Sequence, residues 1–422
     1  MNKLQNLVSK LEKHHKRKID LTLDRTFNLL KKLGNPQDKI KNVINVVGTN
    51  AKASMSYSLK SILNEAGYKC NLYTSPHLQS FTERFIFDDK EIKEEELIEL
   101  LNDIEKVLGN DNASLFEILT CAFLKYAENY KDNINIIEAG LFFQFDSTNV
   151  FKHNLMTLIG VIHTDHLQWL KNKTIDGIIH EKTSKLLNSN IFINRQLNEE
   201  IRAKIEKALL NNSSKKYFFG KEFNISKQEN GFILYQDDMG EIILPKPNLL
   251  GDHQLYNIST SIAASRKMFN VKDQHIKKGI TKIELKGRLQ ELTSGKLKEI
   301  SGQNRLIIDG GHNESSSMSI SNWIKQQNQD VHLICGMMKD KEHYEFMKNF
   351  KDVVKSITLI DIPNQQGSIS KEEFKDKLNN LNIDINLCSS IQEAIKINSK
   401  HQDSICLFTG SLYMVGEILN LN

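Results

Sequence analysis

The sequence predicts an α/β protein of two domains, each built around a mainly parallel sheet. Three observations support this expectation. The chain has 422 residues, which exceeds the usual size of one compact core. Short β-rich apolar runs alternate with helical patterns almost throughout, as in proteins whose parallel strands are joined by helices. The alternation is interrupted after Ser214 by a stretch that reads as short strands and turns.

In the first half, five apolar runs are expected to be strands. They are Val43–Val47, Cys70–Tyr73, Ile134–Glu138, Met156–Ile162 and Ile191–Asn194. The stretch after Ser214, as far as Gly251, predicts a small antiparallel addition to this domain.

A second series of apolar runs follows Gly287. These expected strands are Arg305–Asp309, His332–Cys335, Ser356–Asp361, Ile383–Leu387 and Ser404–Thr409, with helical patterns between them. This spacing is typical of a doubly wound, Rossmann-like domain. We therefore place the boundary near Ile283–Leu292 and expect domains at 1–285 and 286–422.

The composition is that of an ordinary globular protein. Lys and Arg number 56 against 52 Asp and Glu, a formal net charge of +4 that is too mild for this length to indicate nucleic acid or an anionic membrane as a partner. The N-terminus has no secretory signal and no apolar run approaches 18 residues, so we expect a cytosolic protein. The five scattered cysteines lack a C-x-x-C pair and predict buried thiols rather than a disulfide or zinc framework.

The stretch "VVGTNAKAS" joins the first expected strand to a helix with apolar residues at helical spacing. Such a turn aims main-chain N–H groups and the positive end of the helix dipole at one point, where phosphate binds. Lys52 would add charge, and the Ser54 hydroxyl could reach Mg²⁺.

The match to the G-x-x-x-x-G-K-[ST] pattern is poor, so a chance lysine in an ordinary turn stays an alternative on pattern alone. Alanine resists positive φ, and a loop that needs glycine geometry at Ala51 or Ala53 would bear a cost of about 1 kcal/mol.

A series of motifs runs along nearly the whole chain in one order. "LDRTFNLLKKLGNPQ" and "GTNAKAS" are followed by "TSPHLQSFTERF", "SLFEILTCAF", "IEAGLFFQFDSTNV", "HTDHLQWLKNKTIDGIIHEK", "LLGDHQLYN", "KGRLQ", "IDGGHN", "GMMKDKE" and "GSLYMVGEI". Together they resemble the folylpolyglutamate synthase/dihydrofolate synthase family of the Mur ligase superfamily. The resemblance implies a P-loop ATPase domain followed by a Rossmann-like, glutamate-binding domain.

The family commonly reads G-T-N-G-K-G-S at the phosphate loop and L-G-G-R-L-D-A-T-N after a metal-binding glutamate. Here Ala51 and Ala53 depart from the first pattern, and Phe142-Phe143-Gln144 departs from the second. We expect the second loop to lose its glycine-only geometry and one positive charge.

The resemblance implies an ATP site in both domains. Its residues are Thr49, Asn50, Ala51, Lys52, Ala53, Ser54, Asn257 at the adenine, Arg288 at the phosphates and Asp309 at the ribose. Taken alone, Asn257, Arg288 and Asp309 could be a turn asparagine, a surface arginine and a strand-end aspartate.

The resemblance also implies two Mg²⁺ sites and a monovalent cation such as K⁺. The metal ligands would be Ser54, Ser75, Glu138, His166 and Lys182 as a carbamate. Glu138 follows an apolar strand, where ligands bind in parallel sheets, although a lone glutamate there could simply face solvent.

Lys182 shares a helical face with Ile175, Ile178, Ile179 and Leu186. Its head could reach water, or it could be buried, neutral and able to take up CO₂. The resemblance favours burial.

Two substrate sites follow from the resemblance. The pterin residues would be Asp20, Leu21, Ser114, Leu115, Phe116, Glu117, Phe145, Asp146 and Ser147. Asp146 is chemically attractive because a carboxylate can accept from two adjacent N–H groups of an aminopterin edge, whereas Phe116 is as compatible with core packing as with stacking. Glutamate would meet His312, Lys341 and Ser411, whose cationic and hydroxyl donors suit a dicarboxylic amino acid.

The implied activity is ATP-dependent addition of L-glutamate to dihydropteroate, to reduced folates, or to both, through an acyl phosphate. Lys52, Lys182, His166 and Arg288 would be the catalytic residues. We expect a monomer with small-molecule substrates and no nucleic-acid or membrane partner.

Three alternatives stay open. The first is a Mur-type ligase for another carboxylic acid, and the second is a non-catalytic ATP-binding relative. The third is a peptidoglycan-precursor ligase, for which the 47 residues before Gly48 are expected to be too few to form the additional domain.

Overall fold

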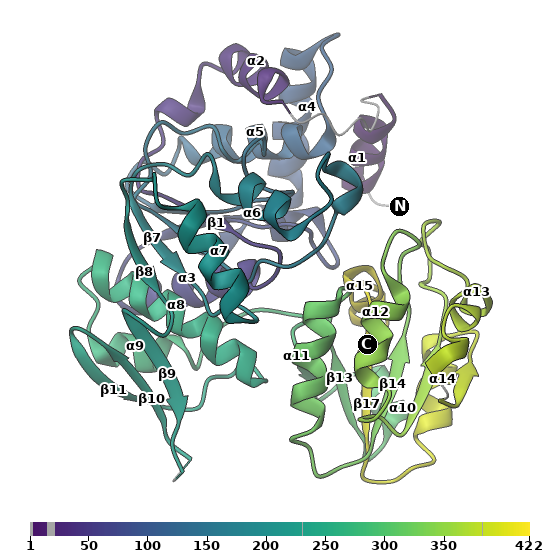
Figure 1. Ribbon diagram of the computed structural model, residues 1–422. Helices are drawn as coiled ribbons and strands as arrows, with labels where there is room; N and C mark the ends of the chain where they lie inside the picture. The colour runs from purple at the N-terminus through teal and green to yellow at the C-terminus, as the bar shows by residue number, and fades with distance from the viewer. Residues whose placement is uncertain (1–2, 15–21, 230, 382) are drawn as a thin grey trace. The chain divides into compact units, whose positions relative to one another are not determined.

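The computed structural model describes residues 3–14, 22–229, 231–381 and 383–422, and the chain forms two compact units (Figure 1). The first unit contains Met1–Asn248 and Tyr256–Glu284, and the second contains Leu249–Leu255 and Leu285–Asn422. Residues 249–255, which the sequence analysis assigned to the first domain, thus belong to the second unit.

The first unit is built on an eight-stranded sheet with the order β4-β3-β2-β5-β1-β6-β7-β8. Its strands are β1 (Val43–Val47), β2 (Cys70–Tyr73), β3 (Phe85–Phe87), β4 (Lys90–Glu91), β5 (Ile134–Glu138), β6 (Met156–Ile159), β7 (Asn190–Ile193) and β8 (Lys215–Phe218). The strands β2, β5, β1, β6, β7 and β8 are parallel to one another. Strands β3 and β4 add an antiparallel edge next to β2. Every residue of β1 and β5 is buried, as expected for central strands covered on both faces.

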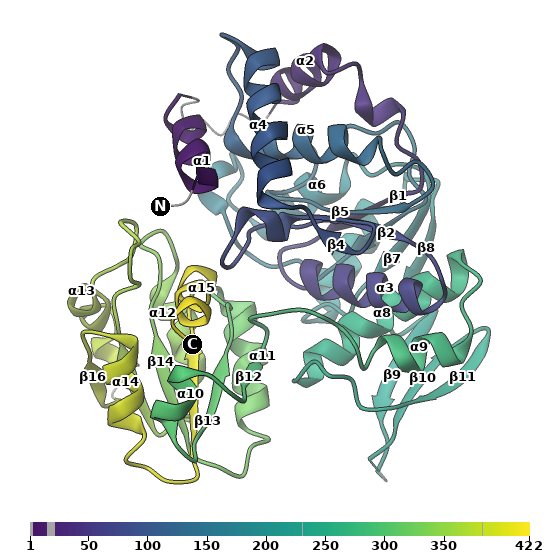
Figure 2. The same cartoon turned by 180° about the vertical axis from the view of Figure 1, so that it is seen from behind.

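Helices cover both faces of this sheet. The helices of the first unit are α1 (Lys3–His14), α2 (Asp24–Lys32), α3 (Lys52–Glu65), α4 (Glu94–Leu108), α5 (Leu115–Ala127), α6 (Ile175–Thr183), α7 (Glu199–Ala208), α8 (Asp252–Met268, in this unit from Tyr256) and α9 (Asp273–Gly279). Apolar residues of α5, α6 and α7 pack against one face, with α6 and α7 in front in Figure 1. On the other face α3 contacts β1, β2 and β5 and packs against α9, as Figure 2 shows.

The predicted antiparallel addition is confirmed from Phe223 onward, but Lys215–Phe218, which was expected to belong to it, is the parallel edge strand β8 of the main sheet. Strands β9 (Phe223–Lys227), β10 (Ile233–Asp237) and β11 (Gly240–Leu244) form a separate antiparallel sheet. Arg266 of α8 lies 3.1 Å from Asp237 at the end of β10, and both side chains are almost completely buried. This ion pair joins the small sheet to α8.

The second unit contains a six-stranded sheet with the order β12-β13-β17-β14-β15-β16. Its strands are β12 (Gln290–Leu292), β13 (Arg305–Ile308), β14 (Val331–Cys335), β15 (Ser356–Leu359), β16 (Ile385–Leu387) and β17 (Ile405–Thr409). All are parallel except β12. Because β13, β17 and β14 are parallel neighbours, the loops that follow them leave the sheet at the same edge.

The helices of this unit are α10 (Lys296–Ser301), α11 (Glu314–Ile324), α12 (His343–Met347), α13 (Lys371–Asp376), α14 (Ile391–Asn398) and α15 (Leu412–Leu421). The two α/β sheets and the small antiparallel addition confirm the predicted fold class. All five cysteines are buried and free of disulfides. Within the described part of the chain, no helix is long and apolar enough to cross a bilayer.

Candidate functional site

The turn after β1 is held against the segment that follows β6. The main-chain N–H groups of Thr49 and Asn50 both donate to the carbonyl of Val161, at 2.8 and 3.1 Å. A β-carbon on Gly48 would lie 3.0 Å from the Asn50 carbonyl oxygen and 3.1 Å from Gly160 Cα, so the approach requires glycine. These contacts fix the turn at the carboxyl edge of the sheet.

Helix α3 begins at this turn with an uncapped N-terminus. No side chain caps it at Ala51, and the first helical bond runs from Met55 N to Ala51 O at 2.9 Å. The N–H groups of residues 52–54 precede that bond and point out of the helix end, where its dipole is positive. This is the anion-binding geometry that the sequence predicts.

The two alanine departures have different consequences. Ala51 has φ 74°, so it adopts the left-handed conformation in which an L-residue loses roughly 1–2 kcal/mol. Ala53 lies inside α3 and carries no such strain. The expected cost therefore applies at position 51 and not at 53.

Lys52 extends along the phosphate loop. Its Nζ donates to the carbonyls of Gly48 and Thr49 at 3.1 and 3.3 Å and lies 3.9 Å from Glu138 Oε1. Glu138 is the last residue of β5 and is 3% exposed. A buried carboxylate thus lies beside the lysine at the sheet edge.

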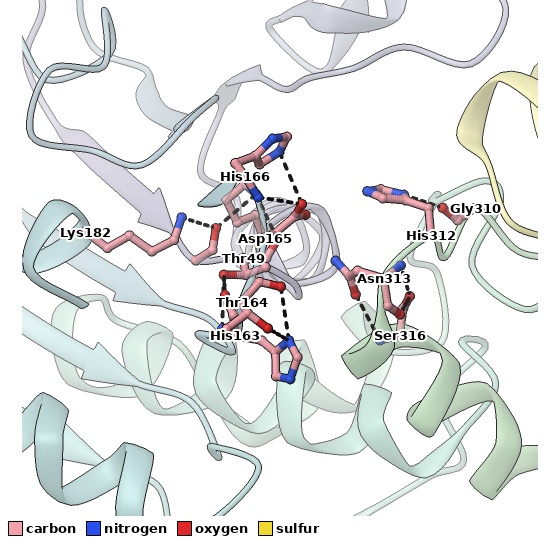
Figure 3. A network of polar contacts seen from close by, with 12 residues as sticks. Thr49, His163, Thr164, Asp165, His166, Lys182, Gly310, His312, Asn313 and Ser316 are labelled. Atoms are coloured by element: carbon pink, nitrogen blue, oxygen red, sulfur yellow. Dashed lines mark hydrogen bonds and ion pairs between the residues drawn. The ribbon is translucent and has the colours of Figure 1, made fainter. Parts of the chain in front are cut away.

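Lys182 is buried, which confirms the favoured expectation over the solvent-directed one. It is 5% exposed in α6, and its Nζ donates to the Gly48 carbonyl at 3.0 Å (Figure 3). Burial, with a smaller effect of the nearby Lys52 charge, lowers the pKa of Lys182 to about 7. A substantial fraction of the amine is therefore neutral near pH 7.

The loop at residues 163–166 is tied to the same turn. Thr49 Oγ1 donates to the His163 carbonyl at 2.9 Å and accepts from His163 N at 3.1 Å. The His166 N–H donates to Asp165 Oδ1 at 2.9 Å, and the His166 ring lies 3.8 Å from that oxygen (Figure 3). Asp165 therefore orients His166, whose side chain is 37% exposed.

The described residues contain no group of three His, Cys, Asp or Glu side chains arranged to hold a metal. Among the expected ligands, Glu138 and Ser54 are buried at the loop, and Ser75 is half-buried two residues after β2. One carboxylate with hydroxyl oxygens suits Mg²⁺, which takes one or two carboxylates and completes its shell with water and substrate phosphates. The site therefore fits a cation that binds together with a nucleotide.

The expectation that the loop after β5 abandons glycine-like geometry is wrong at Phe142. This residue has φ 58° and is 3% exposed. The loss of the family's arginine does hold, because Gln144 is neutral and its Oε1 accepts from Ser184 Oγ at 2.8 Å.

Asp146 organises this loop. Its Oδ2 accepts from the N–H groups of Gly140 and Leu141 at 3.0 and 2.9 Å, and its Oδ1 accepts from Thr148 N and Oγ1 at 3.0 and 2.5 Å. Burial raises the pKa of Asp146, and these bonds oppose the shift. Both oxygens are engaged, so the expectation that they accept from an aminopterin edge does not fit this arrangement.

Two of the expected pterin segments meet at Gly140. A β-carbon on Gly140 would lie 2.6 Å from the Phe116 ring and 3.1 Å from Asp146 Oδ2, and Ser147 Oγ lies 2.8 Å from Thr120 Oγ1. Half-buried Leu115 packs against the core of the first unit, and Phe145 is exposed.

Ser114 and Glu117 have local structural roles. Ser114 caps α5, and the Glu117 carboxylate accepts from Ser114 N at 2.6 Å and pairs with Arg25 at 3.0 Å. Asp20 and Leu21 lie outside the described residues.

In the first unit, Asn257 is buried on α8 and its Oδ1 accepts from Asn194 at 2.8 Å. In the second unit, Asp309 follows β13 and accepts from the N–H groups of Leu289 and Gly311 at 2.8 and 2.7 Å. Burial raises the pKa of Asp309, while the neighbouring Arg288 opposes the shift.

The expected glutamate residues His312, Lys341 and Ser411 follow β13, β14 and β17, and thus lie in loops at one sheet edge. His312 Nδ1 lies 3.0 Å from the Gly310 carbonyl oxygen, and Ser411 caps α15 by accepting from Tyr413 N.

Comparison with known proteins gives consistent results. Residues 287–412 match the Mur ligase, glutamate ligase domain. The chain is 28% identical to the dihydrofolate synthase/folylpolyglutamate synthase of Bacillus subtilis, with 94% of each chain covered. The corresponding Escherichia coli protein is 25% identical over 99% of this chain and 95% of its own. Over nearly its whole length the chain is therefore similar to curated dihydrofolate synthases/folylpolyglutamate synthases, and its C-terminal part matches the Mur ligase, glutamate ligase domain.

Solved structures of proteins with these names share the fold of this chain. The Yersinia pestis folylpolyglutamate synthase/dihydrofolate synthase complexed with AMPPNP and Mn ion has a TM-score of 0.86 at 23% identity, covering 100% of this chain and 98% of its own. Escherichia coli FolC in complex with DHPP and ADP has a TM-score of 0.84 at 25% identity, with 99% and 97% covered.

Gly160 is a further residue of the site that was not predicted from the sequence. A β-carbon at this position would lie 2.3 Å from the Asn50 carbonyl oxygen, so any other residue would displace the phosphate loop. The available signal was a lone glycine inside the apolar run "LIGVIH", which indicates close approach of another backbone.

Proposed function

We propose that the protein is an ATP-dependent ligase that adds L-glutamate to dihydropteroate, to reduced folates, or to both. The observation that carries the proposal is the convergence of Lys52 and Lys182 on the Gly48 carbonyl, beside Glu138 and at the open N-terminus of α3. This arrangement, at the carboxyl edge of a parallel sheet, supports binding of an anion such as a phosphate group. Relatives that cover 94% and 99% of the chain have the corresponding synthase names.

The proposed reaction proceeds in two transfers. A carboxylate is a poor acceptor for an amine, so the substrate carboxylate first attacks the γ-phosphorus of ATP, and ADP leaves. The glutamate amine then attacks the carbonyl carbon of the acyl phosphate, loses a proton, and expels inorganic phosphate as the amide forms.

The chain's own residues would bind and neutralise the phosphates. Lys52 and the N–H groups of residues 52–54 would hold the phosphate oxygens. Thr49 and Asn50 would act through the loop geometry, because their N–H groups already donate to Val161. We propose Asn257, Arg288 and Asp309 as further nucleotide contacts.

The divalent cation is proposed to be Mg²⁺, at two sites, together with a monovalent cation such as K⁺. Glu138, Ser54, Ser75, His166 and a carbamate on Lys182 would provide the ligands. When bound, the divalent ion supplies positive charge to the transferring phosphoryl group.

The pterin is proposed to bind near Gly140, where Ser114–Glu117 meets Phe145–Ser147, with Asp146 shaping the loop. Glutamate is proposed to bind at His312, Lys341 and Ser411. A cytosolic location and a monomeric state stay predictions from the sequence.

Phosphate release by purified protein tests the function. The reaction would contain ATP, Mg²⁺ and glutamate with either dihydropteroate or tetrahydrofolate. We expect release that requires glutamate and at least one of the two acids. Hydrolysis independent of both, or none, would contradict the proposal, and turnover only with another carboxylic acid would favour a related Mur-type ligase.

A further inference from the structure

Phe142 is a large apolar residue in a backbone conformation that favours glycine. It has φ 58°, is 3% exposed, and belongs to an apolar cluster with Ile178 and Ile179 of α6. A non-glycine residue in the left-handed region is strained and persists only where its surroundings hold it there. The packing of the ring therefore determines the backbone at this position.

The Phe142 ring lies next to the Lys182 amine. Its centroid is 5.7 Å from Nζ, within the range of a cation–π contact. The same amine donates to the Gly48 carbonyl at 3.0 Å. One nitrogen thus contacts both the phosphate loop and the ring of the loop after β5.

The loop that carries Phe142 is also fastened to α6 on both sides of Lys182. The Gln144 N–H donates to the Glu181 carbonyl at 2.9 Å, and Ser184 Oγ donates to Gln144 Oε1 at 2.8 Å. The first of these bonds satisfies a carbonyl in the last turn of α6, where intrahelical partners are missing. Gln144 therefore hydrogen-bonds to residues on both sides of this lysine.

We propose that Phe142 is a positioning residue that shields the Lys182 amine from water and holds it against the Gly48 carbonyl. The consequence for catalysis rests on the proposed ligase function, in which Lys182 is a proposed cation ligand near the phosphate loop. The shielding itself does not depend on that function.

Trace acetylation of the substrate-free protein with acetic anhydride tests the shielding. Peptide mass spectrometry would give the rate at Lys182 relative to exposed Lys185 in the same molecule. Phe142→Gly removes the ring and suits the positive φ. We expect it to raise the relative rate at Lys182 about fivefold or more, as loss of one such contact raises the open population.

Phe143→Ala is the matched control, because Phe143 is a buried ring of the same cluster and loop. It should leave the Lys182 rate unchanged. Phe142→Leu keeps an apolar wall and should give an intermediate rate, and it serves as the second variant if Phe142→Gly does not fold. An unchanged rate in the Phe142 variants, or an equal rise in Phe143→Ala, would overturn the inference.

Turnover separates this inference from the proposed function. In the ligase assay, Phe142→Gly is expected to lower kcat about fivefold while the KM for ATP stays the same, since one contact to the amine is lost. Faster acetylation in a protein with no ligase turnover would support the shielding and reject the function. Normal ligase turnover with unchanged acetylation would reject the shielding alone.

Discussion

Lys182 Nζ donates a 3.0 Å hydrogen bond to the main-chain oxygen of Gly48, 134 residues earlier in the sequence. Lys52 Nζ donates to the same oxygen at 3.1 Å. Burial, followed by the charge of Lys52, lowers the pKa of Lys182. These two bonds connect α3 and α6 to the turn after β1.

Replacing Lys182 with alanine is expected to reduce turnover about 10²–10³-fold, because a group beside the transferred phosphoryl is lost. Small carboxylic acids such as acetate should restore part of the rate by taking the place of the proposed carbamate. Lys185→Ala is the control, since Lys185 is exposed three residues later. Full activity of Lys182→Ala without added acid would reject the metal-site role.

Replacing Ala51 or Ala53 of the phosphate loop with glycine is expected to change the free energy of unfolding in opposite directions. Ala51→Gly should raise the free energy of unfolding by roughly 0.5–1 kcal/mol, because relief of the left-handed strain exceeds the added entropy of the unfolded chain. Ala53→Gly should lower it by roughly 0.5–1 kcal/mol, because glycine gains more conformational freedom than alanine in the unfolded chain. Urea unfolding of both variants would measure the difference, and equal signs would contradict the assigned backbone geometry.

Because of His77, we expect the free energy of unfolding to fall at acid pH. Its Nδ1 accepts from Arg84 Nε at 2.9 Å, and its ring packs on Phe81 at 4.0 Å. Burial, followed by the Arg84 charge, lowers the pKa of His77 from 6.5 to about 3. Between these values the unfolded chain binds more protons, so the free energy of unfolding falls as pH falls from 6.5 towards 3.

His77→Asn keeps a neutral acceptor and should weaken this dependence. Urea unfolding at pH 5 and pH 7 would test it in both proteins. The same difference between the two pH values in wild type and variant would show that His77 does not contribute.

Asp146→Asn distinguishes an organising carboxylate from a substrate-binding one. An amide has one acceptor oxygen, so buried N–H groups of Gly140, Leu141 or Thr148 would lose their partner. We expect the free energy of unfolding to fall by about 1–3 kcal/mol. Unchanged stability with a raised KM for the pterin substrate would instead support direct recognition.

The sequence predicted the fold well because its central strands are continuous apolar runs that parallel sheets bury on both faces. Val43–Val47, Cys70–Tyr73 and Ile134–Glu138 are strands with the expected bounds. The run Met156–Ile162 predicted a longer strand, but β6 ends at Ile159. Gly160 lies against the Asn50 carbonyl, and apolar periodicity does not encode this contact.

The candidate site was only partly predictable, because its polar groups depend on contacts distant in sequence. The apolar helical face that contains Lys182 indicated a buried lysine. It did not indicate that the hydrogen-bond partner would be the Gly48 carbonyl. The glycine preference of the loop after β5 suggested that Phe142 could not keep positive φ, but tertiary packing overrides that preference. Asp146 likewise looked available for substrate, but its own loop engages both oxygens.

Isotope transfer tests the central claim most directly. Dihydropteroate or tetrahydrofolate labelled with ¹⁸O in the acceptor carboxylate would be incubated with the protein, ATP, Mg²⁺ and glutamate, and the released phosphate analysed by mass spectrometry. Activation of the carboxylate by phosphoryl transfer predicts one ¹⁸O atom in each phosphate released with product. Unlabelled phosphate accompanying amide formation would contradict it.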